Sequence, residues 1–227
     1  MHRRDIFRGS LALAVIALAG PLPAQVPPGP DEIAAYQGLH RAAHAGDVAG
    51  IRKLLAAGAP PDPRDGRQRT PLHVACHARQ REAMRALVAG KADPKAVDAQ
   101  NYDCITIAAV ADDVPTLETA IAIGGDARQI TSPYQGTALI AAAHLGHDGV
   151  VKTLIGARAP LDHVNNLHWT ALIEAVILGN GGPRHIETVR LLVEAGARRD
   201  LADREGRTPL DHARSRGYAA MVALLTK

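Results

Sequence analysis

Two pairs of histidines have a spacing that could bind a metal ion. His40 and His44 lie four residues apart, and so do His73 and His77. On a helix this spacing places both imidazoles of a pair on one face, where they can share a metal. A zinc protease, however, has a glutamate directly after its first histidine, and neither pair has one. A metal- or ligand-sequestering function is therefore kept only as the alternative, and the sequence predicts no metal site and no cofactor.

The two cysteines, Cys76 and Cys104, raise the question of a disulfide, which an oxidising compartment would permit. Counted from the starts of their helices, their positions differ by five residues, a rise of about 7.5 Å. Neighbouring helices lie about 10 Å apart, so the combined separation is roughly 12 Å. That exceeds the limit of about 7 Å for a disulfide. The sequence therefore predicts two free thiols, with Cys76 buried.

The chain shows no other pattern that is typical of an active site. It has no nucleophile elbow, no phosphate-binding glycine loop and no zinc-deaminase pattern. The sequence therefore predicts no catalytic residues and no enzymatic activity.

The elements that must position these side chains are set by an internal repeat. The hexapeptide TPLHVA recurs in weakened or degenerate form, and successive copies begin 33, 33, 34, 33 and 38 residues apart. A threonine can cap a helix and a proline fits its first turn, so each copy predicts the start of a helix. A second apolar stretch and usually a Gly-Ala turn follow. The copies begin at Gln37, Thr70, Asp103, Thr137, Thr170 and Thr208.

This pattern resembles the ankyrin repeat, and the resemblance covers roughly residues 34–227. It implies an all-α solenoid of about six helix-turn-helix repeats, starting near residues 34, 66, 99, 132, 166 and 204. Only 3% of the residues are aromatic, and a core of small aliphatic side chains suits thin layers of helices. One such helix pair cannot bury its apolar face alone, so neighbours must supply the other wall. The resemblance also implies a non-catalytic module that binds proteins in a concave groove.

Six residues, each directly before one copy of the hexapeptide, are expected to point into that groove. These pre-threonine positions are Tyr36, Arg69, Tyr102, Gly136, Trp169 and Arg207. Tyr134 lies two residues away from one of them. Tyr, Trp and Arg are the types most enriched among binding hot spots. The alternative is that each ring lies flat on the next turn as local packing.

A second set of positions, seven residues after each copy begins, is expected on the groove side of the first helices. It contains three imidazoles, which could make binding depend on pH because an unperturbed histidine titrates near 6.5. Histidines are also common as surface residues without a role. The set is His44, His77, Val110, His144, Ile177 and Ser215. From both sets the sequence predicts these partner-binding residues: Tyr36, Arg69, Tyr102, Tyr134, Trp169, Arg207, His77 and His144.

The first 24 residues have the features of an export signal. Arg3, Arg4 and Arg8 precede an apolar stretch that is too short to span a bilayer, so a cleaved signal peptide over residues 1–24 is expected. The paired arginines also resemble the twin-arginine export motif, although His2 stands where Ser or Thr is usual. A proline-rich spacer over residues 25–33 follows. The sequence therefore predicts a periplasmic or secreted protein with no membrane contact beyond the signal.

Removing residues 1–24 takes away three arginines and one aspartate, so the net charge of +3 becomes +3 − 3 + 1 = +1. A nearly neutral chain lacks the dense basic face that nucleic acid requires. The sequence therefore predicts an unidentified protein partner, no nucleic acid and a monomer. A purely structural spacer is a third possibility.

Two repeats depart from the pattern. In the third repeat Asp103 replaces the threonine, and this repeat is expected to be the least stable. The fifth carries an insert over Gly179–Arg184, whose glycines predict a long, mobile loop between its two helices. A solvated loop without a role is the alternative for this insert.

Overall fold

The computed structural model describes residues 25–226, so the predicted signal peptide and twin-arginine motif lie outside the described residues. Within residues 25–226 the regular structure is helical, apart from one isolated antiparallel bridge between Thr131 and Gly136. No helix of this part is long and apolar enough to cross a membrane. The predicted all-α fold is confirmed. The helices are α1 (Pro30–Ala35), α2 (Gly38–Ala45), α3 (Val48–Ala56), α4 (Pro71–His77), α5 (Arg81–Ala89), α6 (Cys104–Val110), α7 (Val114–Ala122), α8 (Ala138–Leu145), α9 (Asp148–Gly156), α10 (Ala171–Ile177), α11 (Pro183–Glu194), α12 (Pro209–Ser215) and α13 (Ala219–Leu225).

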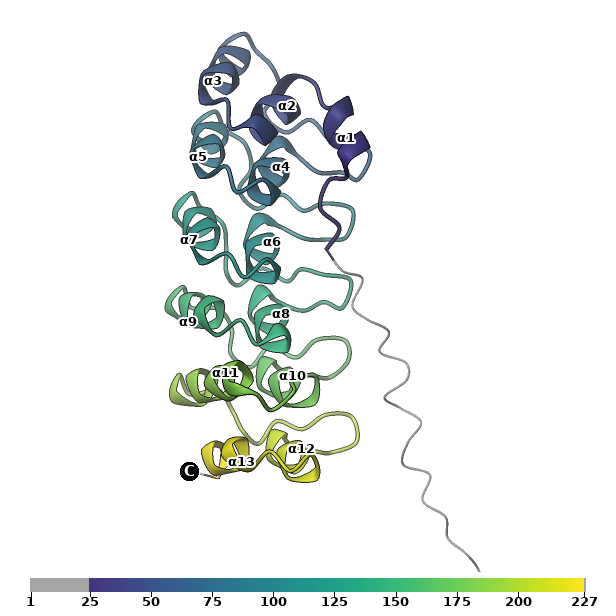
Figure 1. The fold of residues 1–227 in the computed structure, drawn as a ribbon, viewed down its shortest axis with the longest axis vertical. Coiled ribbons are helices and arrows are strands. Elements are labelled where there is room, and N and C mark those ends of the chain that lie inside the picture. Colours follow the sequence, from purple (N-terminus) through teal and green to yellow (C-terminus); the bar gives the residue numbers. More distant parts are fainter. Residues whose placement is uncertain (1–24, 227) are drawn as a thin grey trace, which may run out of the picture.

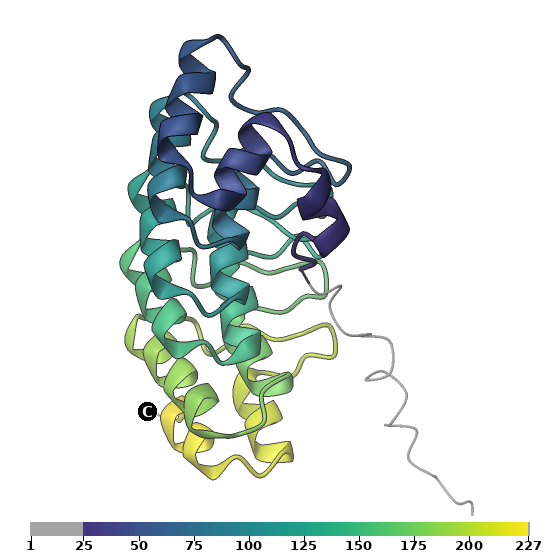
Figure 2. The ribbon, with the colours of Figure 1, turned by 45° about the horizontal axis from the view of Figure 1, so that its top comes forward.

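The helices form two parallel columns (Figure 1). The first helices of the repeats (α2, α4, α6, α8, α10 and α12) make one column, and the second helices (α3, α5, α7, α9, α11 and α13) make the other. The loops that join one repeat to the next project from the side of the first column, as Figure 2 also shows. We call this side, with the loop tips and the adjoining first helices, the loop face. The structure thus has the six stacked helix pairs that the repeat predicted.

Side-chain caps explain where the first helices begin. Thr70 Oγ1 accepts a hydrogen bond from the backbone N–H of His73, and His73 Nδ1 in turn accepts one from the backbone N–H of Thr70. This reciprocal pair satisfies two donors that a helix start leaves open. In the degenerate third repeat, Asp103 caps the start of the helix, since its carboxylate accepts from the backbone N–H of Thr106 at 2.8 Å. The other threonine caps are Thr137, Thr170 and Thr208.

A single apolar core runs along the stack from Tyr36 to Leu225. Leucine side chains such as Leu72, Leu139 and Leu172 are almost fully buried between the layers. Alanines without exposed surface let the helices approach closely. They include Ala43, Ala75, Ala109, Ala142, Ala143, Ala175 and Ala213.

The predicted separation of the two cysteines is wrong. Cys76 Sγ donates to the backbone oxygen of Cys104 at 3.2 Å, and Cys104 Sγ donates to that of Leu72 at 3.5 Å. The start of α6 therefore lies beside the middle of α4, and the offset of five residues does not keep the thiols apart. Both cysteines are free and buried, as predicted for Cys76. The adjoining Cys76 thiol, together with burial, raises the pKa of the Cys104 thiol.

The insert of the fifth repeat is packed, which corrects the prediction of a mobile loop. The hydroxyl of Tyr218 donates to the backbone oxygen of Gly179 at 3.1 Å. Arg184 forms ion pairs with Asp112 at 2.8 Å and with Asp148 at 2.7 Å, in the two preceding repeats. His185 Nε2 lies 3.0 Å from the backbone oxygen of His144, in helix α8 of the fourth repeat. The insert is thus held by the repeats on both sides.

The predicted spacer over residues 25–33 also needs correction, because helix α1 begins within it. Pro30 stands in the first turn of α1, where its missing N–H costs no hydrogen bond. Residues 25–29 are without regular structure. Among the described residues, helical structure therefore begins at Pro30, before the first repeat.

A glycine substitution tests the packing of the insert. Gly181 has φ +69°, and a Cβ there would lie 2.7 Å from the ring of Tyr218. We expect Gly181→Ala to lower the free energy of unfolding by about 1–3 kcal/mol, through backbone strain and the clash. Gly66→Ala is the matched control, because a Cβ at Gly66 meets nothing within 4 Å. Urea unfolding of both variants measures the effect, and equal stability of the two would show that the insert is loose.

Candidate partner-binding surface

The residues predicted to bind a partner fall into a buried group and an exposed group. Tyr36, Arg69 and Tyr102 are only 6%, 1% and 4% exposed. Tyr134, Trp169, His77 and His144 are partly exposed, and Arg207 is exposed. The expectation that the pre-threonine positions stand on exposed turn tips is therefore wrong for the first three repeats.

Ion pairs explain the burial of Arg69. Its Nε donates to Asp65 at 2.7 Å and its Nη2 donates to Glu32 of α1 at 2.6 Å. Although burial alone would raise it, hydrogen bonds from the backbone and guanidinium of Arg69 hold the pKa of Asp65 below its usual range. Arg69 thus joins its own loop to α1 and is not free to meet a partner in this state.

The two buried tyrosines pack locally, as the alternative interpretation proposed. The Tyr36 ring stacks on His40 with centroids 5.4 Å apart, and its hydroxyl donates to Asp65 at 3.1 Å. Burial raises the pKa of Tyr36 and of Tyr102. The backbone N–H of Tyr102 donates to Asp98 at 2.9 Å, and this bond fixes the loop that precedes α6.

Two of the four stacked histidines use their ring nitrogens to tie the loops together. His73 Nδ1 accepts from the backbone of Thr70, so its Nε2 carries the proton that is donated to the backbone oxygen of Tyr102 at 3.1 Å. His40 Nε2 bonds to the backbone oxygen of Arg69 at 3.0 Å. Across residues 25–226, no three His, Cys, Asp or Glu side chains gather where they could hold a metal. Nε2 of His40 and both ring nitrogens of His73, two of the four histidines behind the metal-sequestering alternative, are therefore engaged within the fold.

His77 does not have the titration behaviour that was expected of a surface histidine. Burial, together with the nearby Arg69, lowers the pKa of His77 to about 4. Its Nε2 is buried and has no hydrogen-bond partner among the described residues. His77 is therefore neutral at physiological pH.

His144 belongs to a buried polar cluster that sequence reasoning missed. Its Nδ1 lies 3.3 Å from Oε2 of Glu174, a carboxylate that is only 2% exposed. Oε1 of Glu174 accepts from Asn165 Nδ2 at 2.8 Å. In the last repeat, His212 and Asp203 stand at the positions equivalent to Glu174 and Asn165. There His212 Nε2 lies 2.6 Å from Asp203 Oδ2. A carboxylate at a hexapeptide position that is apolar in the second, third and fourth repeats (Val74, Ile107 and Ala141) was the signal that could have revealed this cluster.

Apart from His77 in the second repeat, the exposed group lies on the loop face of the last three repeats. Trp169 is partly exposed, and its side chain makes no hydrogen bond to any of the described residues. Val164, in the same loop, is 43% exposed. Tyr134 stands in the preceding loop, and Arg207 stands in the following one, where its guanidinium donates to Ser215 at 2.8 Å. Apolar rings, an aliphatic side chain and a guanidinium together can bind a protein surface.

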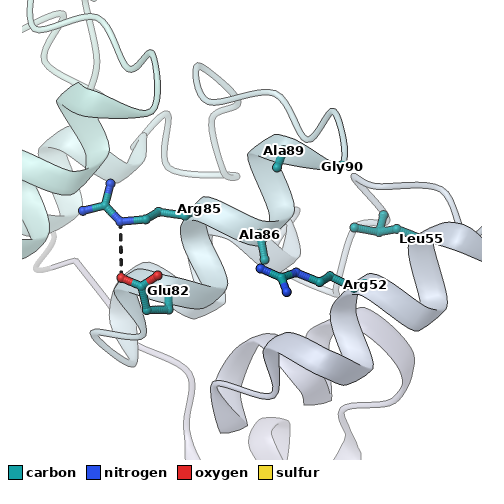
Figure 3. A pocket seen from close by; sticks show the side chains of 7 residues that line it. All are labelled: Arg52, Leu55, Glu82, Arg85, Ala86, Ala89 and Gly90. Atoms are coloured by element: carbon teal, nitrogen blue, oxygen red, sulfur yellow. Dashed lines mark hydrogen bonds and ion pairs between the residues drawn. The ribbon is translucent and has the colours of Figure 1, made fainter.

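Two depressions elsewhere on the described surface hold none of the predicted residues. One, of about 460 Å³, lies between α3 and α5 in the second column (Figure 3). Arg52 extends toward Ala86 there, and Arg85 pairs with Glu82 at 3.4 Å. The other, of about 510 Å³, lies near the last turn of the stack. Its lining is Ala197, Arg198, Arg199, Asp200, Thr208, Leu210 and Leu225.

Comparisons with known proteins agree with this architecture. A family model described as ankyrin repeats (3 copies) matches residues 39–121, 105–198 and 139–227. The chain is 34% identical over 120 residues to the ankyrin repeat protein YahD of Escherichia coli (strain K12), covering 52% of this chain. That match spans 59% of the length of YahD.

Solved structures are similar over most of the chain. The first is an ankyrin repeat domain from Acinetobacter baumannii AYE, with a TM-score of 0.78 and 41% identity over 83% of this chain and 95% of the other. The second is EF0377, an ankyrin repeat protein, with a TM-score of 0.77 and 30% identity over 85% of this chain and 99% of the other. An ankyrin-repeat fold is typically non-catalytic.

The buried histidines predict an acid-sensitive fold. The pKa of His73 is lowered to about 4 by burial, as is that of His77, whereas the unfolded chain titrates near 6.5. Between these values the unfolded state binds more protons, so stability falls as the pH is lowered through this window. We expect each histidine to reduce the free energy of unfolding by about 1–2 kcal/mol between pH 7 and pH 5.

Urea unfolding at both pH values measures this effect. In His77→Gln, the change in the free energy of unfolding between pH 7 and pH 5 should be smaller by the contribution of His77. His168→Gln is the matched control, because His168 is an exposed loop histidine. An unchanged difference in His77→Gln would contradict the assignment.

Two arginines at equivalent positions should differ sharply in their effect on stability. Removing the buried guanidinium in Arg69→Ala leaves the Asp65 carboxylate without its main partner, which is expected to cost about 3 kcal/mol. Arg207→Ala removes an exposed side chain and should change stability by about 0.5 kcal/mol or less. Chemical denaturation of the two variants compares them directly, and similar stabilities would refute the structural role of Arg69.

Proposed function

The chain belongs to the ankyrin-repeat family, and on this premise we propose that it is a non-catalytic module that binds a protein partner at the loop face of repeats 4 to 6. One observation carries the proposal: Tyr134, Trp169 and Arg207 stand on three consecutive loops with surface left exposed. The pre-threonine residues of the first three repeats, Tyr36, Arg69 and Tyr102, are buried instead.

The chemistry of this surface favours a protein over a small molecule. A buried tryptophan normally finds a hydrogen-bond partner for its indole N–H, whereas Trp169 is partly exposed and its indole N–H has no such partner among the described residues. Val164 in the same loop, which is 43% exposed, extends the apolar area. Arg207 adds a charged group at one end. A broad surface of this kind suits a polypeptide with apolar side chains and a polar rim.

We also propose that the protein acts in the periplasm or outside the cell. The basic and apolar pattern of residues 1–24 supports export. The charge of the chain that remains is +3 − 3 + 1 = +1, which supports a protein partner and not nucleic acid. We propose that the chain alone is a monomer.

A pull-down tests this function. The full chain would be used as bait in a periplasmic extract of the source organism, with Trp169→Ala as the test variant. Arg190→Ala is the matched control, because Arg190 lies on α11 in the second column and pairs there with Glu187 and Glu194. Loss of a hot-spot tryptophan costs about 2 kcal/mol or more, which is roughly a 30-fold loss of affinity.

We expect one protein to be retained by the wild type and by Arg190→Ala and to be lost with Trp169→Ala. Titration of that protein in pure form would then give the affinities. Equal retention by all three baits, or by none, would refute binding at this surface. Tyr102→Ala is unsuitable as a test variant, because Tyr102 is buried.

A further inference from the structure

The segment before the first repeat lies across the loop face. Helix α1 stands beside α2 on the side from which the loops project (Figures 1 and 2). None of its residues is buried. We call residues 25–35 the strap. The partly buried Ile33 packs against the apolar core, and polar contacts supply the rest of the strap's attachment.

Those polar contacts centre on one carboxylate. Glu32 Oε1 accepts from Arg69 Nη2 at 2.6 Å and from Arg67 Nε at 3.1 Å. Glu32 Oε2 accepts from the backbone N–H of Gly29 at 2.8 Å. The hydrogen bond from Gly29, with the two arginines, holds the pKa of Glu32 below its usual range. Glu32 is therefore an ionised side chain bound to a pair of arginines.

The strap reaches beyond the second repeat. The side-chain amide of Gln25 lies 3.3 Å from the backbone nitrogen and oxygen of Ile107 in α6. Pro27, Pro28 and Pro30 favour an extended, semi-rigid path between this point and α1. The strap thus follows the loop face over the first three repeats, whose pre-threonine residues Tyr36, Arg69 and Tyr102 are buried.

Arg69 and Arg207 provide an internal comparison. They are the same residue type at the same position of their repeats, yet Arg69 is 1% exposed and Arg207 is exposed. Glu32 of the strap contacts Arg69, whereas Arg207 donates to Ser215. Nη1 of Arg69 and Nε2 of His77 are buried without a hydrogen-bond partner among the described residues. The site around Arg69 therefore has polar atoms that Glu32 does not satisfy.

We propose that Glu32 occupies a carboxylate-binding site formed by Arg67 and Arg69, and that an acidic side chain on an extended segment of the partner takes its place. The proposal rests on the proposed function in one respect, namely that the partner is a protein. The released strap would extend the available loop face from repeats 4 to 6 to repeats 2 and 3.

The exchange is chemically balanced. The incoming carboxylate replaces the carboxylate of Glu32, and Arg69 keeps its 2.7 Å ion pair with Asp65 throughout. The buried guanidinium therefore never loses all its partners. The Glu32–Arg67 pair, whose side chains are 34% and 49% exposed, is weak and screened by salt. The 2.6 Å pair of Glu32 with the buried Arg69 is the contact that an incoming carboxylate must replace. A competing ligand needs only to bind the open state better than the closed one.

Hydrogen exchange of the full chain tests how the strap is held. In Glu32→Gln we expect the backbone amides of residues 33–36 to exchange about tenfold faster than in the wild type, while the amides of α4 to α13 are unchanged. Asp31→Asn is the matched control, because Asp31 is an exposed acid of the same helix that forms no ion pair with the described residues. Unchanged exchange in Glu32→Gln, or faster exchange that spreads to α4, would overturn the proposal.

A competition experiment tests displacement. An octapeptide of alternating Glu and Ala, added to the wild type at millimolar concentration, should accelerate exchange at residues 33–36 severalfold. The same peptide with Gln in place of Glu should have no effect, and Arg67→Gln should abolish the response to the Glu peptide. No acceleration, or equal acceleration by both peptides, would overturn the proposal.

The two proposals can fail separately. A strap that opens with the Glu peptide while no protein is captured in the pull-down would refute the proposed function alone. A captured protein whose binding leaves exchange at residues 33–36 unchanged would refute the strap proposal alone.

Discussion

Every part of this molecule depends on burial between neighbouring repeats. A helix pair with a core of alanine and leucine cannot cover its own apolar face, so each repeat is stable only against the next. Leu72, Leu139 and Leu172 are buried by this stacking. At the end of the stack one wall is missing, and α13 buries only Met221 and Leu225. The loops are positioned by the same stacking, because they join layers whose spacing the core has already fixed.

Polar contacts then decide which loop residues remain available to a partner. His73 and His40 each bond to a backbone oxygen of the next loop, so loop positions are tied from repeat to repeat. In the second repeat, the pre-threonine residue Arg69 is held by ion pairs with Asp65 and Glu32. In the second half, Trp169 is left partly exposed. The same repeat architecture thus provides packing at one end and a binding surface at the other.

The sequence was sufficient for the features that repeat and not for those that join distant residues. The recurring hexapeptide predicted the helix pairs, because capping and apolar spacing act within a few residues. It could not predict the burial of Arg69, which depends on Glu32, 37 residues away. Nor could it predict the docking of the insert, since Arg184 reaches Asp112 across 72 residues. The distance between the cysteines was wrong because sequence spacing does not give the offset of adjacent helices.

The central claim is that a partner seats on the loop face of repeats 4 to 6. The most direct measurement is the hydrogen-exchange footprint of the full chain in complex with a protein that it captures. The account predicts slower exchange in residues 131–136, 164–169 and 202–207, the loops that carry Tyr134, Trp169 and Arg207, with α3, α5 and α11 unchanged. Protection confined to the second helices would contradict it and would place the partner on the opposite side of the stack.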